Sequence, residues 1–347
     1  MIVIAYLEFR PRIGADVDAA ADAAVIGRAE IGARCHLGQL ATVRADGEDI
    51  RIADDCWFAD FSTVHIAHSV FPAVVGHGVT VASFGLVHAC DLGAGCVVGE
   101  HALVMDNSRI GPAAVIAADS VVPPGKTLEG GWLYAGIPAK AVRPISAQEV
   151  ATLHGLVRGH LAAGNTALEA VLRSAVPVPA LTSTPGDGLP SKPIYGAYIA
   201  PTASLDGNLS LASGASIWFG VEIVGGGDIL IGAGSNVQDN TRIELKAGEH
   251  IDIGPRVTVG HNVRMAACVI EDQAMVGMGA VVGVGTVVRS GGVIAAGAVT
   301  AAGTEVGAGE IWSGNPARRW KPLPADNRAN FARGVEVYIE YAMNYSR

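Results

Sequence analysis

The sequence predicts a mainly β protein built from two solenoids of short strands, each followed by an α-helix. Aliphatic residues recur about every six positions, a period that fits neither a helix nor an open sheet. The pattern occurs twice along the chain and in the same phase. Glycine supplies 45 of the 347 residues and aromatic residues only 5%. Such a composition is typical of tightly wound coils of small residues.

The two copies of the repeat are separated by 178 residues, and their inward-facing positions are predicted at Val75, Val81, Val87, Leu92, Val98, Val104, Ile110 and Ile116 in the first copy and at Ile253, Val259, Met265, Ile270, Val276, Val282, Val288 and Ile294 in the second. Even the five-residue step from Val87 to Leu92 recurs, from Met265 to Ile270. We infer that the chain arose by duplication.

Three six-residue units make one triangular coil of about 18 residues, and neighbouring coils stack at the strand spacing of about 4.8 Å. A residue is therefore expected to lie next to the one 18 positions later. This predicts a single column formed by His65, Ser83 and His101, with Thr63 as the inward position before the first histidine.

The order of elements follows from the segments that close each solenoid. After the first, Ser146 with Glu149 three residues later predicts the start of a helix that runs over about 150–163. Residues 175–190 are rich in proline, serine and glycine and are predicted to link a first domain, 1–174, to a second, 191–347. The segment 327–345 predicts a terminal helix.

Charge and cysteine content exclude several classes of function. A net charge of −9 offers no basic footprint for nucleic acid. Five cysteines without a CxxC pair indicate neither a disulfide framework nor a thiolate zinc site. No run reaches the roughly 20 apolar residues that span a bilayer, and the first residues lack the features of a signal peptide. We expect a cytoplasmic protein that acts on a small molecule, with no membrane partner.

Histidines are divided between the copies in a complementary way. Three equivalent positions carry a histidine in one copy only: His65 opposite Glu244, Ser83 opposite His261, and His88 opposite Ala266. Neither copy keeps three imidazoles, but together they do.

The motifs around these histidines resemble the γ-class carbonic anhydrases, a left-handed parallel β-helix family of the hexapeptide-repeat superfamily. The first copy reads VRADGEDIRIA, FADFSTVHIAHSVFP, VTVASFGLVHAC, VGEHA and GIPAK, and the second reads EIVGGGDILIG, NVQDNTRIE, VTVGHNVRMAAC, VGMGA and GNPAR. The resemblance covers nearly the whole chain apart from the linker. It implies two left-handed parallel β-helices that assemble as trimeric rings in a homo-oligomer.

The resemblance also implies a metal site. Carried over residue by residue, the ligands are His65, His88 and His261. The implied metal is Zn²⁺, with Fe²⁺ or Co²⁺ as alternatives. Three neutral imidazoles that leave a coordination position open are the arrangement of catalytic zinc, which lowers the pKa of bound water to about 7.

Residues implied to assist catalysis are also divided between the copies. Arg44 and Asp46 occur only in the first copy, and Gln238 only in the second, whereas the aspartate of the QD motif is present in both, as Asp60 and Asp239. Our hypothesis is one composite site between the first and second domains, where metal-bound hydroxide hydrates CO₂. The protein would then be a zinc-dependent lyase, assembled in rings that mix the two kinds of domain.

Other functions remain open at this point. The same site could hydrolyse an amide, ester or thioester, and Trp57 with Phe58 hints at a pocket for a larger substrate. Acyl transfer from coenzyme A with one histidine as general base is a further alternative, as is a non-catalytic scaffold. His101 could act as a displaced ligand if first domains form rings only with one another. Metal content and coenzyme A binding distinguish these alternatives.

Overall fold

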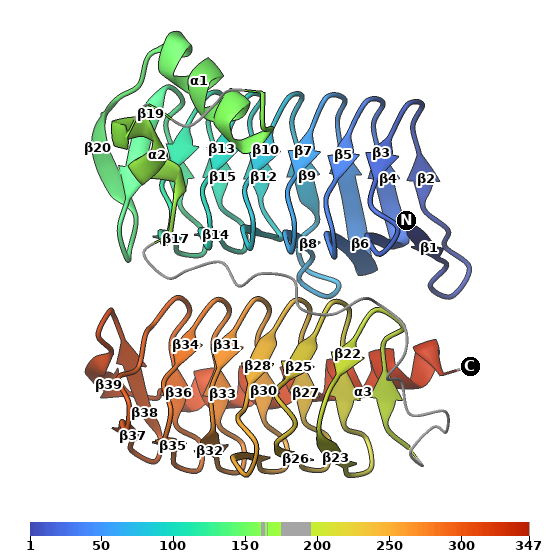
Figure 1. Ribbon diagram of the computed structural model, residues 1–347, viewed down its shortest axis with the longest axis vertical. Coiled ribbons are helices and arrows are strands. Elements are labelled where there is room, and N and C mark those ends of the chain that lie inside the picture. The colour runs from blue at the N-terminus through green and yellow to red at the C-terminus, as the bar shows by residue number, and fades with distance from the viewer. Residues whose placement is uncertain (161–163, 165, 175–195, 347) are drawn as a thin grey trace. The chain divides into compact units, whose positions relative to one another are not determined.

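The computed structural model describes residues 1–160, 164, 166–174 and 196–346. The chain divides into two compact units, Met1–Ala180 and Leu181–Arg347. Each unit is a solenoid of short parallel strands, so the predicted mainly β architecture is confirmed (Figure 1). The linker predicted at 175–190 lies outside the described residues.

In the first unit, two walls of the solenoid belong to one large sheet. Among the described residues this sheet contains β1 (Ile2–Ile4), β2 (Arg12–Ile13), β4 (Ala24–Ile31), β6 (Thr42–Ile52), β8 (Thr63–His65), β9 (Ala73–Val75), β11 (Leu86–His88), β12 (Asp91–Leu92), β14 (Leu103–Val104), β15 (Arg109–Ile110), β17 (Val121–Val122) and β18 (Thr127–Leu128).

The third wall of the first unit is a separate sheet. Its strands are β3 (Asp18–Ala19), β5 (His36–Leu37), β7 (Trp57–Phe58), β10 (Thr80–Val81), β13 (Val97–Val98), β16 (Val115–Ile116), β19 (Trp132–Ala135) and β20 (Lys140–Pro144). The last two strands pair antiparallel and close the solenoid.

In the second unit the three walls are three separate sheets. The first contains β21 (Tyr198–Ile199), β24 (Ser216–Ile217), β27 (Asn236–Val237), β30 (Thr258–Val259), β33 (Met275–Val276), β36 (Val293–Ile294), β38 (Glu310–Ser313) and β39 (Arg318–Pro322). The second contains β22 (Ser204–Leu205), β25 (Glu222–Val224), β28 (Arg242–Glu244), β31 (Arg264–Met265) and β34 (Val281–Val282). The third contains β23 (Asn208–Leu211), β26 (Asp228–Ile231), β29 (His250–Ile253), β32 (Cys268–Ile270), β35 (Thr286–Val288) and β37 (Glu305–Val306).

The two units differ because β6 of the first unit runs without a break through a corner. Its first residues pair with β8 and its last residues pair with β9. In the second unit the same corner is a tight turn at Gly225, which has a φ of 102°. A Cβ there would lie 1.6 Å from the carbonyl oxygen of Leu245, so only glycine fits. The first unit thus has an extended strand where the second has a sharp bend.

The interior of each solenoid is the core that the repeat predicts. Every predicted inward position, from Val75 to Ile116 and from Ile253 to Ile294, is buried in the core of its own unit. Because successive strands stack these aliphatic side chains directly on one another, each coil buries the apolar face of the next.

The predicted column of His65, Ser83 and His101 is wrong. The strand register pairs His65 directly with His88, which is 23 residues later rather than 18. The extra residues form the excursion after β8, where Ala67 and Phe71 form an isolated bridge.

The inward residue of β8 is also different from the prediction. Val64, not Thr63, lies in the apolar core beside Val87. His65 and His88 each follow one of these inward valines, so both side chains leave the same wall on its outer face.

Three helices are present among the described residues, and two of them were predicted. Helix α1 (Ala147–Val157) begins at Ser146, whose side chain forms the predicted capping box with Glu149. It ends earlier than 163, and α2 (Thr166–Leu172) follows it without having been predicted. Helix α3 (Ala325–Tyr345) is the predicted terminal helix.

In both units a helix covers the equivalent wall of the solenoid. Helix α1 packs against β10 and β13, and α3 packs against β21, β24 and β30. None of the described helices combines the length and the apolarity that crossing a bilayer requires. All five cysteines are buried and free, as the sequence indicates.

Candidate metal centre

The first unit brings two of the three predicted ligands together. His65 at the end of β8 and His88 at the end of β11 are register partners on adjacent strands. Their ring centroids are 5.4 Å apart, and a ligand nitrogen of one lies within 4.8 Å of a ligand nitrogen of the other. Two neighbouring imidazoles at this spacing can bind one cation.

The orientation of both rings is fixed by acceptors at Nδ1. Nδ1 of His65 lies 2.7 Å from the carbonyl oxygen of Arg44. Nδ1 of His88 lies 2.5 Å from Oδ1 of Asp106. A carbonyl and a carboxylate are acceptors, so each Nδ1 carries the proton and each Nε2 keeps its lone pair. Metal-binding histidines have this arrangement, and the donor set therefore fits a divalent metal.

Asp106 was not among the predicted site residues. It lies 18 residues after His88, the length of one coil, and β11 pairs with β14 just before it. Because equivalent positions of successive coils stack, the period itself could have identified this carboxylate as the neighbour of His88.

Arg44 and Asp46 lie beside the histidine pair. Arg44 is the register partner of His65, on the next strand of the same wall. Its guanidinium forms an ion pair with the Asp46 carboxylate on the same strand, β6. The ion pair joins two residues that the resemblance implies in catalysis, and Arg44 stands in the same row as the two imidazoles.

Cys90, two residues after His88, lies in the apolar core of the first unit, on the opposite side of the wall from the two imidazoles. Burial raises the pKa of its thiol well above the ordinary value.

His261 lies in the second unit, at the turn after β30. Its Nδ1 is 3.1 Å from Oδ2 of Asp239, and its Nε2 is 3.3 Å from the hydroxyl of Tyr338 on α3. Asp239 is itself fixed, because its Oδ1 accepts a hydrogen bond of 3.0 Å from the backbone N–H of Phe219. A metal on Nε2 would replace the Tyr338 hydroxyl as its partner.

The remaining predicted site residues have local partners. Gln238 donates from Nε2 to Oδ1 of Asn236 at 3.0 Å, in the second unit. In the first unit, Oδ1 of Asp60 accepts a hydrogen bond of 2.8 Å from the backbone N–H of Gln39. Asp60 and Asp239 therefore share a structural task, which is to fix the turn of the preceding coil.

The equivalent rows of the two units have different side chains: Arg44, His65 and His88 in the first, and Val224, Glu244 and Ala266 in the second. Glu244 accepts a hydrogen bond of 2.7 Å from Nε of Arg242. Val224 and Ala266 border a hollow of about 660 Å³ in the second unit. The second unit therefore has an ion pair and open space where the first has imidazoles.

At the position equivalent to His261, the first unit has Ser83 and therefore no imidazole. Ser83 and Ala59 border a small cavity of about 130 Å³, next to Leu156 of α1 and Leu172 of α2. The first unit therefore has short side chains beneath the covering helices where the second has an imidazole.

Two other expectations are not supported. Phe58 lies in the apolar core, so it cannot shape a substrate pocket. Trp57 stacks on His36, with ring centroids 3.7 Å apart. His101 stacks on Phe84 with a centroid distance of 4.8 Å, and it lies in a different row from His65.

Comparison with known proteins gives relatives that match less than half of this chain. Protein YrdA of Escherichia coli is 30% identical over 154 residues, which is 43% of this chain and 84% of that protein. Gamma carbonic anhydrase 2, mitochondrial, of Arabidopsis thaliana is 36% identical over 145 residues, 40% of this chain and 52% of that protein. No family model matches the chain.

A solved structure is similar to this chain over nearly its whole length. A protein named "putative acetyltransferase from Desulfovibrio desulfuricans G20" has a TM-score of 0.56 and 11% identity, and covers 99% of this chain and 82% of its own. At this identity the likeness shows a shared fold.

Proposed function

We propose that this chain, which belongs to the γ-class carbonic anhydrase-like family, is a metal-dependent enzyme that hydrates CO₂. The observation that carries the proposal is the histidine pair of the first unit. His65 and His88 are adjacent, and both have Nδ1 bound to a fixed acceptor. Such anchoring is a feature of metal ligands.

A catalytic zinc site uses three protein ligands and keeps one position open. The pair supplies two, and we propose His261 as the third. Its Nδ1 faces the Asp239 carboxylate at 3.1 Å, a longer contact than the 2.5 Å hydrogen bond between His88 and Asp106. The composite site therefore requires the His65/His88 face of one first unit and the His261 face of one second unit, in the same chain or in a trimeric ring of several chains.

The residues of the chain have defined tasks in this proposal. Arg44 and Asp106 keep protons on Nδ1, so that both Nε2 lone pairs stay available. A bound Zn²⁺ would supply a water that is acidic enough to react at neutral pH. The amide of Gln238 is the group that would orient this water, and the Arg44–Asp46 ion pair keeps the β6 row rigid. Imidazole ligands also suit Fe²⁺ and Co²⁺.

Metal analysis of single variants tests the site. His65→Ala, His88→Ala and His261→Ala should each remove bound metal from the purified protein. His77→Ala is the matched control, since its side chain is 64% exposed and pairs with Asp55. Full metal content in His261→Ala would exclude the composite site while leaving a two-histidine site to consider.

Activity then separates the reaction types. We expect metal-dependent CO₂ hydration that follows metal content across the variants. Turnover of an ester such as p-nitrophenyl acetate without CO₂ hydration would instead identify a hydrolase. A wild-type protein without metal would indicate a scaffold, and coenzyme A binding would indicate a transferase.

A further inference from the structure

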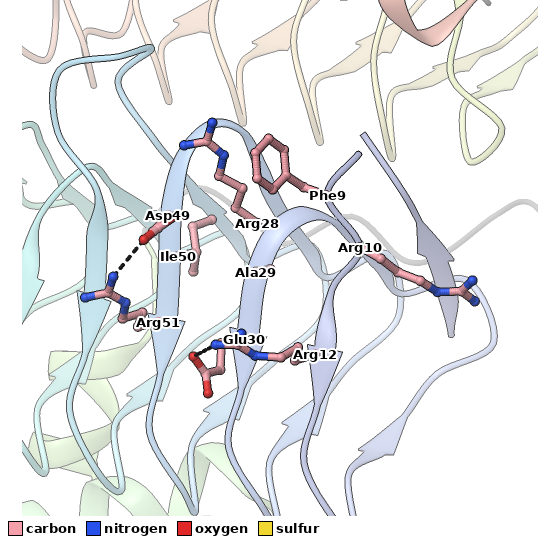
Figure 2. Close-up of a pocket in the computed structure, with 9 residues that line it drawn as sticks. All are labelled: Phe9, Arg10, Arg12, Arg28, Ala29, Glu30, Asp49, Ile50 and Arg51. Carbon is pink, nitrogen blue, oxygen red and sulfur yellow. Dashed lines mark hydrogen bonds and ion pairs between the residues drawn. The ribbon is translucent and has the colours of Figure 1, made fainter. Parts of the chain in front are cut away.

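A second candidate binding site lies at the start of the first unit, on the wall formed by β2, β4 and β6. It is a pocket of about 480 Å³, a size typical of small-molecule sites. Ala29 and Ile50, both buried, form its floor. Figure 2 shows charged side chains around this floor. Arg28 lies on one side, next to the Phe9 ring, and the pairs Arg12 with Glu30 and Arg51 with Asp49 lie on the others.

The charges of the pocket do not cancel. Arg12 pairs with Glu30 at 2.6 Å and Arg51 pairs with Asp49 at 2.7 Å. Arg28 has its guanidinium 4.0 Å from the centre of the Phe9 ring. Neither Arg28 nor Arg10 forms an ion pair with a carboxylate in the described part of the chain. The pocket is therefore positive, although the chain as a whole has a net charge of −9.

The guanidinium groups differ in their availability. Those of Arg12, Arg28 and Arg51 stand around the floor, whereas the side chain of Arg10 extends away from it (Figure 2). Arg12 and Arg51 are 77% and 65% exposed, so a ligand can reach their remaining N–H groups. Arginine donates several N–H groups in one plane and binds phosphate and carboxylate oxygens in pairs.

The second unit provides an internal comparison. The strand register places Leu230 at the position of Arg51 and Ser210 at the position of Glu30. The duplicated coil thus folds without these charges. The arginine cluster is not needed to form the solenoid wall and belongs to the first unit alone.

We propose that this pocket binds a small organic phosphate. The phosphate group lies between the guanidinium groups of Arg28 and Arg51, with Arg12 at the edge, and the carbon body lies over Ala29, Ile50 and the Phe9 ring. A phosphate monoester carries a charge between about −1.5 and −2 at pH 7, which matches the excess of positive charge. The site is independent of the metal centre.

Calorimetric titration of the full chain tests this, with AMP, glucose 6-phosphate and pyrophosphate as probes. AMP or glucose 6-phosphate should bind with a Kd below about 1 mM, whereas adenosine and glucose should not bind. Binding of pyrophosphate alone would assign the pocket to an inorganic phosphate and contradict the proposal. The double variant Arg28→Ala/Arg51→Leu should weaken that binding about tenfold or more, because two charge-assisted contacts are lost. Arg109→Ala removes one exposed arginine of the same unit outside the pocket and should leave binding unchanged.

A second variant should change the affinity for phosphate in the opposite direction. Asp49→Asn releases Arg51 from its carboxylate and should tighten binding of the same probe. The proposal is overturned if neither AMP nor glucose 6-phosphate binds, if the double variant binds as the wild type does, or if Arg109→Ala weakens binding equally.

Discussion

At the scale of residues, the candidate metal centre depends on side chains that hold the ligands as much as on the ligands. His65 and His88 could be predicted from the sequence because the motif and the repeat mark their positions. Asp106 was missed, although it lies one coil beyond His88 and accepts the hydrogen bond from its Nδ1. The expected His65 column failed for a local reason, because the excursion between β8 and β9 lengthens that coil.

Asp106→Asn should weaken metal binding by about 10–100-fold with the fold intact. An amide cannot stabilise the Nδ1 proton of His88 as a carboxylate does, and it can also present its NH₂ group to the ring. Competition with a fluorescent zinc chelator measures the affinity.

The control for this prediction is Asp91→Asn, which removes the same charge from an exposed carboxylate 3.9 Å from Arg109. Equal zinc affinities for the wild type and Asp106→Asn would show that Asp106 does not orient a metal ligand.

At the scale of elements, α1 is attached to the solenoid through a buried polar contact. Nε2 of His154 lies 3.2 Å from the carbonyl oxygen of Gly95, so Nε2 carries the proton. Nδ1 therefore accepts from the Thr80 hydroxyl at 2.7 Å, and the same hydroxyl accepts from Arg158 Nη2 at 2.9 Å. The contact is built for neutral His154.

Stability of this contact should depend on pH. Burial, together with the nearby Arg158 charge, lowers the pKa of His154 from 6.5 to about 4. Between these values the unfolded chain binds a proton that the folded chain does not, so stability is lost as the pH falls from about 6.5 towards 4. With partial solvent screening the effect is on the order of 1–2 kcal/mol.

Hydrogen exchange of α1 amides between pH 7.5 and 4.5, corrected for the intrinsic exchange rate, measures this loss. His154→Gln should flatten the pH dependence, while the exposed control His77→Gln should keep it. A steep dependence that survives in His154→Gln would assign the effect to another group.

Many of the helices and strands could be predicted from the sequence, and those that could not have a physical reason. The six-residue period identified the inward side chains of both cores except at β8, where Val64 and not Thr63 is inward, and the Ser146–Glu149 capping box identified the start of α1. The continuous strand β6 was not predicted, because its course through a corner depends on pairing with β8 and β9, which are distant in sequence. Helix α2 has only 7 residues, too few for a clear periodic signal.

At the scale of the whole molecule, duplication has allowed the two solenoids to diverge. Each unit has its own apolar core, so a change on one outer wall does not require a change in the other. The first unit keeps the His65/His88 row and the arginine pocket, and the second keeps His261 with Asp239. A composite centre makes each half depend on the other for metal binding, although not for folding.

Separately produced halves should show this dependence. Residues 1–180 and 181–347 should each fold, as circular dichroism and a cooperative melt would show. Neither half should retain zinc on its own, and mixing them should restore it.

A mixture that contains the His261→Ala second half is the control and should remain without zinc. Zinc bound stoichiometrically by the first half alone would contradict the composite centre. Native mass spectrometry of the active mixture gives the subunit count, which should be a multiple of three if β-helix rings form.

Both solenoids end in an antiparallel pair, β19 with β20 and β38 with β39. A parallel solenoid would otherwise offer the backbone of its last coil to any passing strand. The reversed strands β20 and β39 instead present exposed basic side chains and a terminal proline, which lacks an N–H to donate. An edge of this kind is a poor template for a further strand, so this wall ends at β20 in the first unit and at β39 in the second, and edge-to-edge pairing of copies along it is disfavoured.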